Sequence, residues 1–90
     1  MCMKSREEKI KDLYELLLSL DNTDDCAALL DDLCTRKEVE KMAERIYAAR
    51  QLIAGKTYSE VIADTDISSA TLSRISNCVQ YGKGYSRLLK

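Results

Sequence analysis

Short hydroxyl side chains and a single arginine gather in one stretch of the chain that contains no acidic residue. The residues concerned are Ser68, Ser69, Thr71, Ser73 and Arg74. Hydroxyl and guanidinium groups donate hydrogen bonds to phosphate oxygens and to the edges of bases. If these side chains share one exposed helix face, that helix could lie in the major groove of DNA.

The elements that must position these residues are predicted by the segment YSEVIADTDISSATLSRI, residues 58–75. Val61 and Ile62 place an apolar ridge on a first short helix, and Thr65-Asp66-Ile67 interrupts it. Ser68 can then cap a second helix. That helix has an apolar face to bury, made of Ala70, Leu72 and Ile75. The order of helix, turn and helix is typical of a helix-turn-helix.

Asp66 stands at the predicted turn, where many helix-turn-helix proteins have glycine. Aspartate tolerates the left-handed conformation better than most residues, so we expect the turn to form at some cost. Lys56 and Thr57 lead into the first short helix, and we include both among the candidate DNA-binding residues.

The charge of the chain is unevenly distributed. Residues 1–35 contain four basic and nine acidic side chains, whereas residues 36–90 contain ten basic and six acidic ones. The two segments therefore carry net charges of −5 and +4, which together give the overall charge of −1. No acidic residue follows Asp66. The positive charge thus lies in the part that contains the candidate DNA-binding residues, and this matters more than the total.

Length and composition predict one small all-α domain over residues 1–90. Hydrophobic residues make up 46% of the chain but aromatic residues only 6%, so the apolar side chains are mainly aliphatic ones that suit helices. We expect dimerisation helices in residues 1–55, the helix-turn-helix in 56–80 and a C-terminal segment in 81–90. A chain this short with so much aliphatic surface favours a homodimer.

Capping patterns predict where the helices of the first part begin and end. Ser5 with Glu8 forms a capping box for a helix to about Leu20, and Thr23 is the expected N-cap of a helix to about Leu33. A second capping box starts a third helix, which ends at Gly55. The residues of that box are Thr35 and Glu38.

Other classes of function find little support in the sequence. The four cysteines, Cys2, Cys26, Cys34 and Cys78, form no C-x-x-C pair and the chain has no histidine, so we expect no metal site. We expect reduced thiols in a cytoplasmic protein rather than a disulfide framework. No apolar run reaches membrane-spanning length. Neither a catalytic residue set nor a phosphate-binding loop is present, so we expect neither an enzyme nor a cofactor.

Each candidate residue also has a simpler interpretation. Arg74 could be a solvated or ion-paired arginine, and the hydroxyl residues could be ordinary polar surface. Thr35 can serve as a helix cap and Arg45 as a structural or surface residue. Cys78 is interpreted as a core residue rather than a redox sensor.

Residues 31–84 resemble the Trp-repressor superfamily, and specifically its YerC/YecD branch. Four fragments carry the resemblance in order and at family spacing. They are L-C-T-x-x-E from Leu33, A-E-R from Ala43, L-I-x-G-K-T-Y from Leu52, and S-x-A-T-L-S-R from Ser68 with N-C following.

The resemblance implies an all-α bundle in which the N-terminal helices of two chains interlock, with one helix-turn-helix per subunit and a role in bacterial transcription. It implies that Thr35 and Arg45 correspond to residues that help to bind tryptophan, and Arg74 to a third. The residue after that arginine is glycine in the Trp repressor and Ile75 here. We therefore expect no response to tryptophan, and the sequence does not identify another effector.

The resulting prediction is a sequence-specific DNA-binding regulator of transcription. The alternative is a helical protein-interaction module that uses the same fold without binding an operator. A gel shift with DNA at several salt concentrations separates the two, because phosphate contacts make DNA binding salt-dependent.

Overall fold

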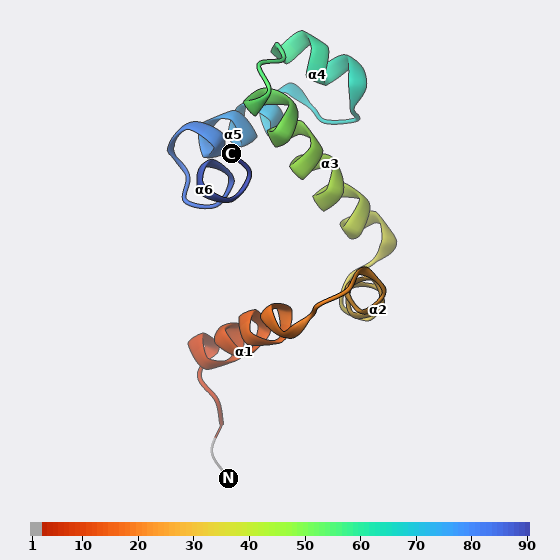
Figure 1. Cartoon of the computed structure of the whole chain (residues 1–90), viewed down its shortest axis with the longest axis vertical. Coiled ribbons are helices and arrows are strands. Elements are labelled where there is room, and N and C mark those ends of the chain that lie inside the picture. Colours follow the sequence, from red (N-terminus) through yellow and green to blue (C-terminus); the bar gives the residue numbers. More distant parts are fainter. Residues whose placement is uncertain (1–2) are drawn as a thin grey trace. The chain divides into compact units, whose positions relative to one another are not determined.

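The computed structural model describes residues 3–90, and within them the chain folds only into helices (Figure 1). The helices are α1 (Arg6–Ser19), α2 (Thr23–Leu33), α3 (Arg36–Ile53), α4 (Tyr58–Asp64), α5 (Ser69–Tyr81) and α6 (Tyr85–Leu88). The all-α prediction is confirmed. These helices form two compact units, residues 1–36 and residues 37–90.

In the first unit, local hydrogen bonds determine where both helices begin. The capping box of α1 is confirmed, because Ser5 Oγ accepts from the Glu8 N–H at 3.1 Å and the Ser5 N–H donates to Glu8 Oε1 at 3.0 Å. The predicted cap of α2 is wrong by one residue. Asn22, not Thr23, is the N-cap, and its Oδ1 accepts from the Asp25 N–H at 2.8 Å. The Asn22 amide also donates to the Asp25 carboxylate at 2.9 Å.

Helices α1 and α2 contain no buried residue. Their aliphatic side chains are nevertheless numerous, and several are between 36% and 86% exposed: Ile10, Leu13, Leu16, Leu17, Leu18 and Leu33. This exceeds the single exposed apolar residues that are normal on a protein surface. The first unit therefore has apolar helix faces but no buried core in the single chain.

In the second unit, α3 ends at a glycine whose backbone only glycine adopts easily. Gly55 has φ +95°, and its N–H donates to the Leu52 carbonyl at 3.0 Å. The Lys56 N–H donates to the Gln51 carbonyl, also at 3.0 Å. These two bonds form a Schellman motif, which confirms the predicted end of the helix.

We expect Gly55→Ala to lower the free energy of unfolding by about 1–2 kcal/mol, the cost of a Cβ in the left-handed region. No heavy atom lies within 4 Å of the position where that Cβ would be, so the cost comes from the backbone and not from a clash. Gly84→Ala is the matched control, because its Cβ is equally unobstructed and its φ is −90°. Urea denaturation of the two variants measures the difference, and equal stabilities would contradict this account.

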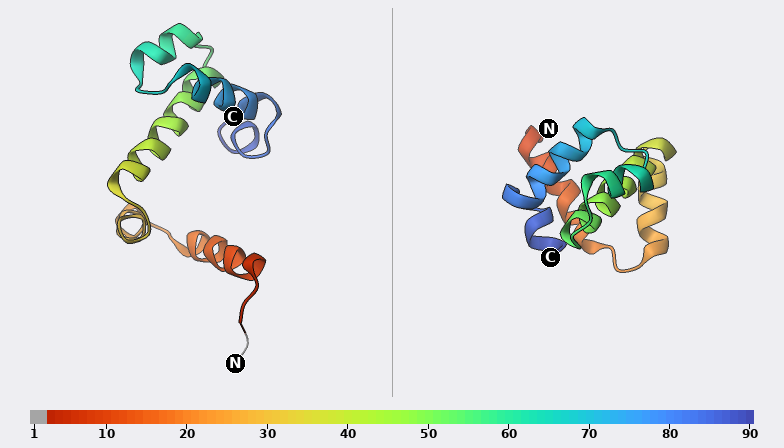
Figure 2. Two further views of the ribbon diagram at one scale, coloured as in Figure 1. Left: turned by 180° about the vertical axis from the view of Figure 1, so that it is seen from behind. Right: turned by 90° about the horizontal axis from the view of Figure 1, so that it is seen from above.

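The core of the second unit lies where α5 packs against α4 and α6 and meets the C-terminal half of α3. Both views in Figure 2 show α6 beside α5. The buried hydrophobic residues are Ala48, Ala49, Val61, Leu72, Ile75 and Val79. Alanines on α3 leave room for the larger side chains of α4 and α5. This packing fixes the position of α5 within the second unit.

Three residues predicted to be apolar contacts of the helix-turn-helix are exposed. Val61 is buried, but Ile62 is 39% exposed, and Ala70 and Cys78 are exposed as well. The buried side of α5 is made of Leu72, Ile75, Ser76 and Val79. Successive helical residues are about 100° apart, so Ala70 points about 160° and Cys78 about 120° away from Leu72. The interpretation of Cys78 as a core residue is therefore wrong.

The expected strain at Asp66 is also absent. No residue other than glycine has a positive φ within residues 3–90, so Asp66 is not left-handed. The turn is instead stabilised by Thr65. Its hydroxyl donates to the Val61 carbonyl at 2.8 Å and accepts from the Ile67 N–H at 3.4 Å. One side chain thus bonds to α4 and to the segment before α5.

Candidate nucleic-acid interface

The N-terminus of α5 is organised by the hydroxyls of Ser68 and Thr71. Ser68 Oγ accepts from the Thr71 N–H at 3.2 Å and donates to Thr71 Oγ1 at 3.1 Å. The predicted cap of this helix is therefore confirmed. The Thr71 hydroxyl can still donate to an external acceptor, since it accepts in its contact with Ser68.

The remaining candidates on α5 lie on its exposed side. Ser69, Ser73 and Arg74 are exposed, while Thr71 is half-buried. Arg74 forms no salt bridge or hydrogen bond with any residue of 3–90. Its guanidinium therefore remains available to a ligand outside the chain.

Lys56 and Thr57 have structural partners at the start of α4. Thr57 Oγ1 accepts from the Glu60 N–H at 3.2 Å, and the Thr57 N–H donates to Glu60 Oε1 at 3.3 Å. These contacts form a capping box, and hydrogen bonds from the Thr57 backbone and side chain lower the pKa of Glu60. Lys56 Nζ lies 3.7 Å from a Glu60 carboxylate oxygen. The T-x-x-E spacing was the sequence signal for this cap.

A further contact, which the sequence did not indicate, joins α3 to α4. The Tyr47 hydroxyl donates a hydrogen bond to the carboxylate of Asp64, the last residue of α4. This bond raises the pKa of Tyr47, because ionising the phenol would remove the donor and place a negative charge beside the carboxylate. The contact ties the first helix of the helix-turn-helix to α3.

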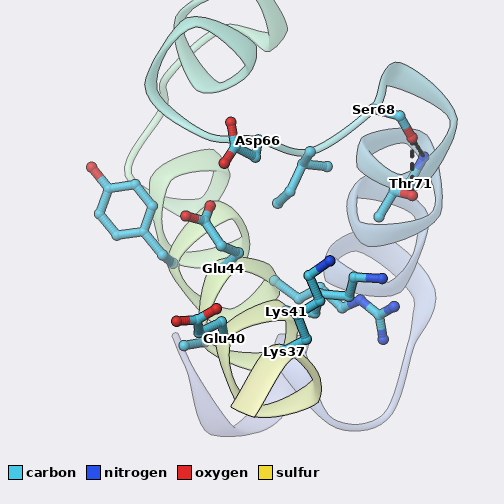
Figure 3. A pocket seen from close by; sticks show the side chains of 11 residues that line it. Lys37, Glu40, Lys41, Glu44, Asp66, Ser68 and Thr71 are labelled. Carbon is cyan, nitrogen blue, oxygen red and sulfur yellow. Dashed lines mark hydrogen bonds between the residues drawn. The ribbon is translucent and has the colours of Figure 1, made fainter. Parts of the chain in front are cut away.

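A groove of about 870 Å³ lies between α3 and the N-terminal part of α5 (Figure 3). Its walls carry side chains of both charges and several hydroxyls, including Lys37, Lys41, Arg45, Glu44, Asp66, Ser68 and Thr71. Glu44 Oε2 is buried and has no hydrogen-bond partner among the described residues. Of the two candidate effector residues, Arg45 lines this groove, whereas Thr35 is an exposed residue of the first unit.

Several other features of residues 3–90 bear on the class of protein. No group of three or more cysteine and acidic residues in this range could hold a metal ion. Cys26, Cys34 and Cys78 are free thiols, while the prediction for Cys2 falls outside the described residues. In the same range no helix combines the length and hydrophobicity that crossing a bilayer requires.

The chain is similar to proteins of one family over almost its whole length. The sequence profile of the Trp repressor protein family matches residues 8–90. The uncharacterized protein YerC of Bacillus subtilis strain 168 is 38% identical over 79 residues, which cover 88% of this chain and 76% of YerC.

Two solved structures support the same relationship. The crystal structure of a protein from Staphylococcus aureus, provisionally identified as a Trp repressor, matches with a TM-score of 0.83 and 29% identity, over 96% of this chain and 92% of that one. A TrpR-like protein from Eubacterium eligens matches with a TM-score of 0.84 and 31% identity, over 89% of this chain and 84% of that one. Sequence and fold thus agree, and the chain belongs to the Trp repressor family, as a relative of YerC.

Proposed function

We propose that this protein is a sequence-specific DNA-binding regulator of transcription, with α5 as the recognition helix. The observation that carries the proposal is the exposed side of α5, where an unpaired Arg74 follows exposed serine hydroxyls on a helix anchored by its opposite face. Major-groove recognition needs such a rigidly held helix with short polar side chains at its N-terminal end. We place the protein in the cytoplasm, where a regulator would meet DNA and where free thiols persist.

The proposed DNA-binding residues differ in how free they are to contact DNA. Ser69, Ser73 and Arg74 have no competing side-chain partner, whereas Ser68 and Thr57 also cap helices. The Ser68 O–H is donated to Thr71 Oγ1 and the Thr57 O–H to Glu60 Oε1, so each hydroxyl must exchange that partner for a phosphate oxygen to contact the DNA backbone. Lys56 Nζ lies 3.7 Å from Glu60 Oε2 in an exposed salt bridge. Breaking such a surface salt bridge costs little free energy, so Lys56 can still turn to a phosphate.

We also propose that two chains associate through dimerisation helices within residues 1–55. Helices α1 and α2 expose aliphatic faces that no described part of the single chain buries. Burying about 1,000 Å² of apolar surface at about 25 cal/mol/Å² gives a gross gain on the order of 25 kcal/mol, before association and ordering costs. Light scattering at tens of micromolar should give the mass of a dimer, and a monomer would refute this.

We expect that tryptophan does not bind as a corepressor. Ile75 is 4% exposed and packs in the core beside Arg74, where the resemblance indicated glycine next to a bound indole. A branched side chain at this position removes pocket volume, and withdrawing it would open the core. Isothermal calorimetry with millimolar tryptophan should give no saturable heat, whereas micromolar binding would overturn this prediction.

The experiment that tests the proposed function is selection of genomic DNA fragments by the purified full-length protein. Retained fragments should share a sequence, and gel shifts with that sequence should weaken steeply as salt rises. If no fragment is enriched and no shift appears at low salt, the alternative becomes the better explanation. The protein would then be a helical protein-interaction module with the same fold.

A further inference from the structure

Two lysines of α3 face the groove without a charged partner. Lys37 and Lys41 are one helical turn apart, both are exposed, and both line the groove. Neither forms a salt bridge with any residue of 3–90. Like charges four residues apart on a helix repel each other, and an anionic ligand between the two ammonium groups would relieve that repulsion.

The opposite wall of the groove is the N-terminus of the proposed recognition helix. Ser68 and Thr71 line it, and Figure 3 shows the ammonium groups of Lys37 and Lys41 on the side of the groove where Thr71 lies. The N-terminus of a helix carries partial positive charge, and α5 is 13 residues long. Cations from α3 and the positive end of α5 therefore border the same part of the groove.

The acidic residues of the groove lie apart from these lysines. In Figure 3 the carboxylates of Glu44, Asp66 and Glu40 are on the other side of the groove. One oxygen of Glu44 is buried and has no hydrogen-bond partner in the described part of the chain. A polyanion would be repelled from that side and attracted to the lysine side, so the separation of charge gives it a direction of approach.

We propose that Lys37 and Lys41 bind phosphates of the DNA backbone next to the segment read by α5, so that the DNA interface extends from the helix-turn-helix onto α3. This inference rests on the proposed function. Ser68 and Thr71 belong to the proposed DNA-binding set and share the groove with both lysines. A phosphate at the N-terminus of α5 can therefore be reached from α3 as well.

The test is the salt dependence of DNA binding by full-length Lys37→Ala/Lys41→Ala. Each phosphate contact contributes about 0.9 to the slope of log K against log salt, so the variant should lower the slope by about 1.8 per chain. Lys37→Arg/Lys41→Arg should restore it, because the charges return. The matched control is Arg50→Ala/Lys83→Ala, which removes the same charge from exposed positions outside the groove.

The outcomes separate this inference from the proposed function. If wild type binds its selected operator but the lysine variant keeps the wild-type slope, the extension onto α3 is wrong and the function stands. An equal decrease of the salt slope in the control variant would also overturn the inference, because the loss of net charge alone would then explain the decrease. If wild type binds no DNA, the proposed function fails and this inference fails with it. Circular dichroism of each variant checks that the fold is retained.

Discussion

Leu72→Ala is expected to lower the free energy of unfolding by about 2–5 kcal/mol, the usual cost of truncating a buried leucine. Leu72 is 0% exposed and lies among Ala48, Ala49 and Val61 in the core that joins α3, α4 and α5. Truncation would leave a cavity in this core, and alanines such as Ala48 and Ala49 are too small to fill it. For a 90-residue chain, a loss of this size is a large part of the total stability.

The change should appear as a lower urea midpoint with far-ultraviolet circular dichroism as the probe. Leu88→Ala is the control, because Leu88 belongs to the same unit but is 72% exposed, and its effect should stay within about 0.5 kcal/mol. If the two variants had equal stability, the assignment of Leu72 to the core would be wrong. Operator affinity of the Leu72 variant should fall with the folded fraction, without a change in preferred sequence.

Arg74→Ala is expected to weaken DNA binding through charge, or through lost base recognition. If the guanidinium contacts a phosphate, binding to all DNA sequences should be weakened equally, and the salt slope should fall by about one per chain. If it meets guanine instead, about 1–3 kcal/mol of discrimination should disappear at one base pair. Because Arg74 is exposed and has no partner in the described chain, its loss should leave stability nearly unchanged.

Thr71→Ala provides the uncharged comparison on the same helix. It should reduce affinity while leaving the salt slope nearly unchanged, because a hydroxyl releases no counterions. In a dimer each substitution acts twice per operator, and half-sites should be about 10 bp apart or a multiple of that. Titrations at several salt concentrations distinguish these outcomes. If both folded variants bound the selected operator as tightly as wild type, α5 would not be the recognition helix.

Features that depend on nearby residues were predicted well. The capping box at Ser5 and the cap at Ser68 join residues three apart, and the N–H groups of Gly55 and Lys56 bond to carbonyls of the helix that has just ended. Such bonds need no knowledge of the tertiary fold. The wrong prediction of the α2 N-cap also concerns neighbouring residues. Asn22 and Thr23 are adjacent and both residue types are good caps, so only the hydrogen bonds in the structure distinguish them.

Features that depend on packing between helices were predicted poorly. The groove joins α3 to the start of α5, and the Tyr47–Asp64 bond joins residues 17 positions apart, so no local pattern marks either one. Ala70 was predicted to share the buried face of α5 with Leu72 and Ile75, but its direction on the helix leaves it exposed. The family resemblance indicated the helix that we propose to recognise DNA, but it gave no indication of the unpaired lysines on α3.

The Tyr47–Asp64 bond makes the attachment of α4 sensitive to alkali. A free phenol ionises near pH 10, and in the folded protein the bond to Asp64 raises the pKa of Tyr47 above that value. The contribution of this bond to stability is therefore fully present below about pH 10 and is lost as pH rises through the folded pKa. At physiological pH the phenol keeps its proton. The tether between α3 and α4 is thus constant across cellular pH and is lost in strong base.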